Sequence, residues 1–207
     1  MQVSIHEEMV REAFGARFSP RALEIIIAAN KKQDGLRNQI GHDEFHFDNN
    51  AFEKSNRYII EQRGQVIATL LGPGILNAWI AFGRLLHTAQ DFYAHTNYVS
   101  LWLNQFNGTP PPPLGIDPVQ KSLVNSPDLR SGKLYLPLDA LYYVPFLRKI
   151  SLLLLPRDSH ARMNLDSPEQ GPLFAYARAA AVKRTVHELE ILQKLLTPQM
   201  FARFTDL

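Results

Sequence analysis

A regular spacing of His and Asp inside an apolar stretch constrains this sequence more than any other feature. His87, Asp91 and His95 are separated by four residues each, and apolar residues recur at steps of three and four across residues 75–103. This periodicity predicts one long helix over residues 75–103. Positions four residues apart on a helix share one face, with a drift of about 40° per step. The three side chains are therefore expected to point to the same side of this helix.

The residue types and the spacing together indicate a metal site. The chain has no cysteine, so imidazole and carboxylate groups would have to supply the ligands of a transition metal. With a rise of about 1.5 Å per residue, the backbones of His87 and His95 are roughly 12 Å apart, too far for direct ligation of one ion at about 2.0–2.2 Å. Asp91 lies midway and has two oxygens, which can bridge two ions about 3.5–4 Å apart. We therefore predict a multinuclear site with Asp91 between the ions.

Additional ligands have to come from other segments, and two polar loops offer them. Residues 34–50 and 157–172 are rich in polar residues and lack helical periodicity. The candidates in these loops are Asp34, His42, His46, Asp48, Asp158, His160, Asn164 and Asp166. The alternative is that the histidines and carboxylates form ion pairs or pack in the core without a metal. His6, near a terminus, and His187, beside two glutamates, are expected to be ordinary residues.

The remaining pattern predicts an all-α fold with a single domain over residues 1–207. Further helices are expected at 20–30, 52–71, 138–155 and 173–196, and the almost wholly apolar segment 138–155 is expected to be buried. Residues 107–137 include a run of four prolines and have no sustained hydrophobic period. This segment is predicted to be a long surface excursion, locally polyproline II, that either covers a site or is mobile.

Charge and hydropathy narrow the possible partners. The chain has 22 Lys and Arg against 20 Asp and Glu, an excess too small to indicate nucleic acid as an obligate partner. The uncharged run at 64–83 is interrupted by Gly and Pro, as in two core segments around a turn. The first residues lack the features of a secretory signal, which suggests a cytoplasmic protein or one exported without a cleaved signal. The sequence does not specify the oligomeric state.

Three segments resemble one known family. The segment from Leu86 to Val99 resembles the signature of the fungal heterokaryon-incompatibility Het-C proteins and their bacterial relatives. Residues 45–49 are similar to its His-Phe-Asp-Asn element, and residues 158–166 to its later Ser-His, Asn and Asp element, where a Lys often stands at the position of Leu165. The resemblance extends from about residue 30 to 196. It implies a fold like that of the helical zinc-dependent phospholipase C and S1/P1 nuclease superfamily.

This resemblance also implies a ligand set and a metal. The implied ligands are His46, His87, Asp91, His95 and His160, followed by Asp34 and Asp48, and they would hold two or three divalent ions, with zinc as the expected metal. Enzymes of that superfamily use their mature N-terminal residue as a ligand, and nothing at Met1 in the sequence indicates that role. A two-ion site is therefore expected.

The expected function is metal-assisted hydrolysis of a phosphoester, with phospholipids as the substrate class and peripheral contact with a membrane. Asp91 would bridge the ions and orient the attacking water, which makes it the candidate catalytic residue. Two alternatives remain: a membrane-acting cell-death or incompatibility toxin in which the metal is structural, and a metal-free helical binding domain. The metal itself is not specified, because sites of His and carboxylate accept zinc, manganese, iron or nickel.

Overall fold

The structure is a computed structural model, and it describes residues 1–39, 41–142, 144 and 146–207. Thirteen α-helices and four short 3-10 helices make up the ordered elements of this part of the chain. About 69 % of the chain is helical, and the described residues form no strand. Two isolated β-bridges, Thr96 with Ser131 and Lys133 with Ser159, tie loops together. The all-α prediction is confirmed.

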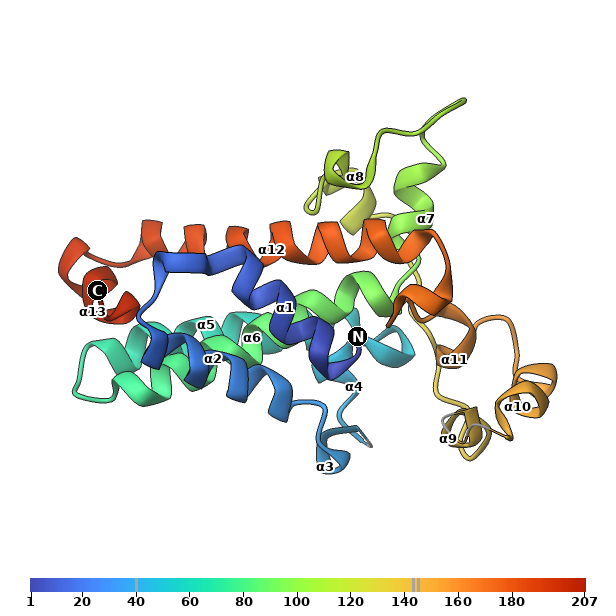
Figure 1. Ribbon diagram of the computed structural model, residues 1–207, viewed down its shortest axis with the longest axis horizontal. Coiled ribbons are helices and arrows are strands. Elements are labelled where there is room, and N and C mark those ends of the chain that lie inside the picture. The colour runs from blue at the N-terminus through green and yellow to red at the C-terminus, as the bar shows by residue number, and fades with distance from the viewer. Residues whose placement is uncertain (40, 143, 145) are drawn as a thin grey trace.

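One central helix, α6 (Ile75–His95), organises the core. Around it pack α2 (Pro20–Lys32), α5 (Phe52–Leu70) and α12 (Leu173–Leu195), while α1 (Val3–Phe14) lies between α2 and α12 (Figure 1). A Cβ on Gly83 would lie 2.3 Å from the carbonyl oxygen of Ile26, so only glycine allows α2 and α6 to approach this closely. At the far end of α6, Trp79 Nε1 donates to the carbonyl of Phe204 in α13 (Pro198–Thr205). The predicted helices at 20–30, 52–71 and 173–196 are confirmed.

The long helix predicted for residues 75–103 is interrupted. Helix α6 ends at His95, because Thr96 is extended with φ −114° and ψ 165°, and α7 (Tyr98–Leu103) follows. The interruption leaves the backbone carbonyl of His95 free to accept a hydrogen bond from the Gly132 amide at 2.9 Å. The break therefore joins the end of α6 to a distant loop.

The two loop regions and the proline-rich excursion contain short helices. These are α3 (Leu36–Gln39), α4 (Asp43–His46), η2 (Asp48–Asn50), η3 (Pro113–Gly115), α8 (Lys121–Val124), α11 (His160–Met163) and η4 (Pro168–Gln170). The remaining 3-10 helix, η1 (Gly15–Arg17), lies between α1 and α2. The proline-rich excursion lies against α12, where Lys183 Nζ donates to the carbonyls of Leu114 and Ile116. Its course along α12 is therefore held by hydrogen bonds.

The prediction of one buried helix over residues 138–155 is wrong. The segment forms two short helices, α9 (Leu138–Tyr142) and α10 (Arg148–Leu154), which project beyond the main helices (Figure 1). Residues 143 and 145 of this segment, and residue 40 of the first predicted loop, lie outside the described residues. A small second core of Tyr142, Leu155 and Ala161 joins the pair to the rest of the protein, and Asp139 Oδ1 accepts from the Ala161 amide at 2.9 Å. Apolar composition alone predicted burial, but no large surface formed by the described residues faces α10.

Hydropathy along the helices gives one further result. Within the described ranges, no helix is both long enough and apolar enough to cross a bilayer.

Candidate metal centre

The carboxylate of Asp91 lies at the centre of a buried cluster of His and Asp side chains. Its Oδ2 is 2.9 Å from His46 Nδ1 and 3.0 Å from His87 Nε2. Its Oδ1 is 3.2 Å from His6 Nε2 and 2.5 Å from the α-amino nitrogen of Met1. The two oxygens thus face different sets of nitrogen atoms, which is the arrangement that a bridging carboxylate requires.

The first group of potential ligands gathers around one side of Asp91. His6, Asp34, His87 and Asp91 each offer one ligand atom, and all four atoms lie within 4.8 Å of one another. The rings of His6 and His87 stack with centroids 4.3 Å apart. His6 is on α1, His87 and Asp91 are on α6, and Asp34 follows α2 by two residues, so the packing of α1 and α2 on α6 builds this group.

A second group of potential ligands gathers around His95, which lies one turn after Asp91 on α6. Asp48, His95 and His160 also offer ligand atoms within 4.8 Å of one another. His160 Nδ1 is 2.8 Å from Asp48 Oδ1, and the rings of His95 and His160 meet edge to face with centroids 4.4 Å apart. Asp166 adjoins this group, with Oδ1 3.1 Å from His95 Nε2. It also contacts the Met1 amino nitrogen at 3.2 Å.

Hydrogen bonds outside the cluster set the orientation of three imidazole rings. His6 Nδ1 donates to Gln90 Oε1, His46 Nε2 to the carbonyl of Asn38 and His95 Nδ1 to the carbonyl of His46, at 2.7, 3.2 and 2.8 Å. Each of these acceptors is an oxygen, so the ring nitrogen that faces it carries the proton. The other nitrogen of each ring faces a carboxylate, where a proton or a metal cation is needed between them. Histidines that ligate metals are usually held in this way.

The backbone around His46 and Asp48 is held in an unusual conformation. Phe47, Asn49 and Asn50 have positive φ values of 59°, 52° and 57°. This conformation is uncommon for a residue as bulky as phenylalanine, and such backbone strain concentrates at functional sites. The Phe47 side chain is buried against Phe92, with ring centroids 5.1 Å apart, and this packing holds the turn in place.

The two asparagines of this turn hold the 131–134 loop, which packs against His160 of the second group. Asn49 Oδ1 accepts from the amide of Leu134, and Asn50 Oδ1 from the amide of Ser131, at 2.8 and 2.7 Å. Between them, a Cβ on Gly132 would lie 2.6 Å from the Cα of His160. Only glycine therefore lets the 131–134 loop pass close enough to position His160 beside Asp48.

Burial and neighbouring charges shift the pKa values of several side chains in the cluster. Burial would raise the pKa of the Asp91 carboxyl, but the Met1 amino group and the nearby imidazoles lower it well below its usual value. Burial lowers the pKa of His87 to about 4, so this imidazole is neutral at pH 7. Burial also opposes the charged form of His160, but Asp48 and Asp166 raise its pKa to about 9. The Asp91 carboxylate thus stays ionised and attracts cations.

The residues present fit one or more divalent cations. His6 Nε2 and Asp34 Oδ2 are buried and have no hydrogen-bond partner among the described residues. Buried polar atoms are normally satisfied, so these two atoms indicate a missing partner. The cluster includes four carboxylates, and no Lys or Arg of the described chain pairs with any of them; these are Asp34, Asp48, Asp91 and Asp166. The Met1 amino group offsets part of this negative charge, and divalent ions would offset more of it, with five imidazoles supplying the nitrogen ligands that zinc prefers.

The structure brings all seven predicted ligands together. His46, His87, Asp91, His95, His160, Asp34 and Asp48 lie in this cluster, and Asp34 is the most exposed of them, with 14 % of its side chain accessible. Among the other loop candidates, His42 pairs with Glu44 and Asp158 with Lys133, away from the centre. His187 lies on the surface near Glu190, as expected of an ordinary residue.

Sequence reasoning did not single out three contributors. The expectation that His6 is ordinary is wrong, because its ring is buried in the first group. Asp166 was one of many loop candidates, and nothing in the sequence distinguished it from Asp158. The α-amino group of Met1 contacts Asp91 and Asp166, although nothing in the sequence indicated that it would lie in the site. Burial lowers the pKa of this amino group, but the carboxylates of Asp166, Asp91 and Asp34 raise it to about 11.

The cluster opens into a cavity of about 560 Å³. His46, Asp48, His95, His160 and Asp166 line one part of this cavity, and the rest of its wall includes Val3, Leu134, Leu136 and Ala140. Of the excursion predicted for residues 107–137, Leu134 and Leu136 line this cavity, whereas the lining includes no residue between 107 and 130. The cavity therefore combines a polar, ligand-rich end with apolar walls.

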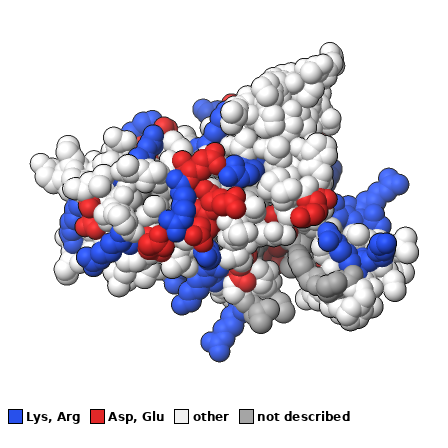
Figure 2. Space-filling view, viewed as in Figure 1, with Lys and Arg blue, Asp and Glu red and all other residues white. Residues whose placement is uncertain are grey.

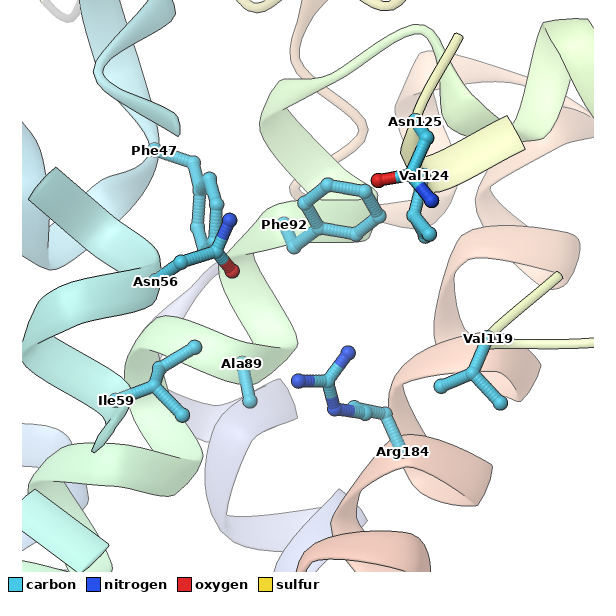
Figure 3. A pocket seen from close by; sticks show the side chains of 9 residues that line it. All are labelled: Phe47, Asn56, Ile59, Ala89, Phe92, Val119, Val124, Asn125 and Arg184. Carbon is cyan, nitrogen blue, oxygen red and sulfur yellow. The ribbon is translucent and has the colours of Figure 1, made fainter. Parts of the chain in front are cut away.

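A separate pocket of about 170 Å³ lies on another side of α6. Its walls include Phe47, Ile59, Phe92 and Val124, and the guanidinium of Arg184 on α12 points into it (Figure 3). Arg184 Nε donates to Glu188 Oε1 at 2.7 Å, and Arg63 donates to the other oxygen of Glu188 at 2.6 Å. None of the potential metal ligands lines this pocket, so it is distinct from the metal centre.

Comparison with known proteins adds one relationship. No curated protein and no solved structure is similar enough to this chain to count as a match. The sequence model of one family, the VWA7 N-terminal domain, matches residues 4–110, which is just over half of the 207 residues. The matched segment contains His6, Asp34, Asp91 and His95, whereas His160 and Asp166 lie beyond it. The chain therefore belongs to the VWA7 N-terminal domain family.

Proposed function

We propose that this protein is a metal-dependent hydrolase that cleaves phosphoester bonds in phospholipids. The observation that carries the proposal is the position of Asp91, whose Oδ1 faces His6 and the Met1 amino group and whose Oδ2 faces His46 and His87. A carboxylate with imidazoles at both of its oxygens can bridge two metal ions, as in two-metal sites that act on phosphate esters. The resemblance of residues 86–99 to Het-C proteins, and through them to the phospholipase C and S1/P1 nuclease superfamily, supports the same reaction class.

Most side chains of the cluster would ligate metal ions, and Asp91 would also position the attacking water. His6, His87 and Asp34 would hold one side, while His95, His160 and Asp48 would hold the other. His46 lies between them, with Nδ1 3.2 Å from His87 Nε2. Zinc, when bound, stabilises negative charge on phosphoryl oxygens and lowers the pKa of a coordinated water. Asp91 would then accept a hydrogen bond from the attacking water and orient it toward the phosphorus.

The shape and lining of the cavity support an amphiphilic substrate. A phosphate group would sit at the His and Asp end, and the apolar part of a lipid would lie along Val3, Leu134 and Leu136. A cavity of about 560 Å³ accommodates a headgroup and the adjoining glycerol rather than whole acyl chains. The chains would therefore extend past Leu136, which is 55 % exposed.

The test combines metal analysis with activity measurements. Purified protein is expected to contain about two equivalents of zinc, and to hydrolyse phosphatidylcholine in a reaction that a chelator abolishes and zinc restores. Asp91→Asn should reduce hydrolysis by at least about a thousandfold, whereas Asp128→Asn, on the surface away from the site, should retain full activity. Protein that binds no metal, or Asp91→Asn that remains fully active, would refute the proposal. A thermal midpoint that chelator leaves unchanged would favour a metal-free binding domain.

One observation favours a second candidate function, a membrane-acting cell-death or incompatibility toxin in which the metal is structural. The α9 and α10 segment presents large apolar side chains to solvent, and Phe146 is 81 % exposed. Such surfaces mark contacts with membranes or proteins. In that case toxicity on expression should survive His87→Ala, provided that circular dichroism shows an intact fold. Toxicity that disappears with His87→Ala but persists with His187→Ala would favour the enzyme.

A further inference from the structure

Helix α10 has the reverse of the usual polarity of a surface helix. Ser151 faces inward, with 2 % exposure, and its hydroxyl donates to the carbonyl of Leu138 at 2.6 Å. Ile150, Leu153 and Leu154 face solvent and are 56 %, 82 % and 63 % exposed. These three positions follow the spacing i, i+3 and i+4, so they form one continuous apolar stripe. An amphipathic helix in water normally buries this stripe, and here it has no covering element among the described residues.

Basic residues surround the apolar stripe. Residues 133–162 contain five Lys and Arg against two Asp, whereas the rest of the chain contains 17 basic and 18 acidic residues. The positive excess of the protein is thus concentrated in this segment. Of its two acidic residues, Asp139 is buried and Asp158 pairs with Lys133. The side chains of Arg148, Lys149 and Arg157 are exposed.

The surface map agrees with this distribution. On the face shown in Figure 2, Lys and Arg surround the region where α9 and α10 lie, and most visible Asp and Glu lie nearer the middle of the molecule. The same segment contributes Leu136 and Ala140 to the wall of the cavity that leads to the metal centre. A surface that docks through α10 would therefore lie next to the opening of the candidate active site.

We propose that the α9–α10 hairpin, residues 134–142 and 146–155, docks this protein onto an anionic phospholipid bilayer. Phe146, Ile150, Leu153 and Leu154 insert among the acyl chains, and Arg148, Lys149 and Arg157 contact the headgroups. Apolar residues on one helix face with Lys and Arg beside them form the pattern of interfacial membrane helices. The inference deepens the proposed function and rests on it for the role of docking, which is to bring a phospholipid headgroup to the cavity.

A bilayer suits this surface better than a protein partner. The apolar side chains project from a protruding hairpin (Figure 1) and do not line a groove. Projecting side chains enter a fluid phase without a complementary pocket, whereas a protein partner would need one. The basic residues match the negative surface potential of a membrane that contains phosphatidylserine.

The experiment measures co-sedimentation of the full chain with vesicles of phosphatidylcholine alone or mixed with an equal part of phosphatidylserine. Asp91→Asn is used for binding, so that hydrolysis does not change the vesicles. Binding is expected to the mixed vesicles and to be several-fold weaker to phosphatidylcholine alone. Substituting Leu153→Ser and Leu154→Ser should weaken binding by at least about tenfold per leucine. Lys149→Gln should weaken it by about fivefold.

Matched controls come from the opposite end of the molecule. Leu71 is 76 % exposed at the end of α5, far from α10 (Figure 1), so Leu71→Ser should bind mixed vesicles as the parent does. Lys194→Gln, near the end of α12, is the control for charge. The variants are compared by circular dichroism to verify the fold.

The possible outcomes separate docking from catalysis. Failure to bind mixed vesicles by a protein that hydrolyses a soluble phosphodiester overturns docking and leaves the proposed function intact. Binding that depends on Leu153 and Leu154 in a protein without any hydrolase activity supports docking and refutes the proposed function. A concentration-dependent dimer abolished by the same substitutions, without vesicle binding, shows that a second copy covers the hairpin and overturns the proposal.

Discussion

His6 Nε2 lies 3.2 Å from Asp91 Oδ1, which joins the first helix of the chain to its central helix inside the metal cluster. Both side chains are fully buried. The contact depends on α1 packing beside α6, so the integrity of the cluster and the packing of the N-terminal helix are coupled. Substitutions on either side of this contact should therefore affect metal binding and stability together.

His6→Ala should lower the affinity for zinc and the stabilisation that zinc provides. Zinc at a hundred times its dissociation constant is expected to raise the free energy of unfolding of the parent protein by about 2.7 kcal/mol. The variant should lose most of this gain at the same zinc concentration, because the first group has one nitrogen ligand fewer. Thermal denaturation with and without zinc measures the difference. His187→Ala is the control, and an equal zinc response in both variants would show that His6 is not a ligand.

Gln90→Met should weaken metal binding without removing a ligand. Gln90 Oε1 accepts hydrogen bonds from His6 Nδ1 at 2.7 Å and from Asn30 Nδ2 at 3.0 Å, which holds His6 Nε2 toward the cluster. Loss of such an orienting partner typically costs about 10–100-fold in metal affinity. Calorimetric titration with zinc measures the change. Gln65→Met, on the exposed surface of α5, should bind zinc like the parent, and unchanged affinity in Gln90→Met would contradict the orienting role.

Gly132→Ala should disturb the second ligand group. The added Cβ would lie 2.6 Å from the Cα of His160, so the loop or His160 must move. A cost of about 1–3 kcal/mol in unfolding free energy is expected from such overpacking, together with a lower zinc stoichiometry. Chemical denaturation and metal analysis measure the two effects. In contrast, Gly64→Ala has no atom within 4 Å of the new Cβ, and on α5 it should stabilise the protein by about 0.5–1 kcal/mol.

Glu188→Gln should destabilise the protein at neutral pH and change how its stability depends on pH. Burial raises the pKa of Glu188, but Arg184 and Arg63 lower it below its usual value of 4.5. The lowered pKa means that the carboxylate contributes stability above the unfolded-state value, and that this contribution disappears as the pH falls through the folded-state value. The variant should lose about 3 kcal/mol at pH 7, because two guanidinium groups lose their partner.

Urea denaturation across a range of pH measures this difference. The gap between parent and variant should be constant above about pH 5 and shrink below pH 4.5. Glu53→Gln is a suitable control, since Glu53 pairs with Arg57 on the surface and is 87 % exposed. A gap that grows on acidification would contradict the assigned direction of the pKa shift.

Much of the site follows from the local pattern of the chain. Positions four apart on a helix share a face whatever surrounds them, so the spacing of His87 and Asp91 was enough to place them together. The midway position of Asp91 followed from the same geometry. Asp48 and His46 could be proposed because the polar segment between residues 34 and 50 is rich in ligand types. The number and pairing of the groups could not be derived in this way.

The sequence by itself determined that the chain is helical and that α6 carries a face of potential ligands, because both depend on interactions among near neighbours. Only the tertiary structure decided that His6 and Asp166 join that face, and that the apolar stripe of α10 remains exposed. Each of these outcomes depends on contacts between segments that are far apart in the sequence. Such contacts are set by how several helices pack against one another, which local sequence patterns do not specify. Composition gives the tendency of a segment to be buried, whereas burial itself requires an opposing surface.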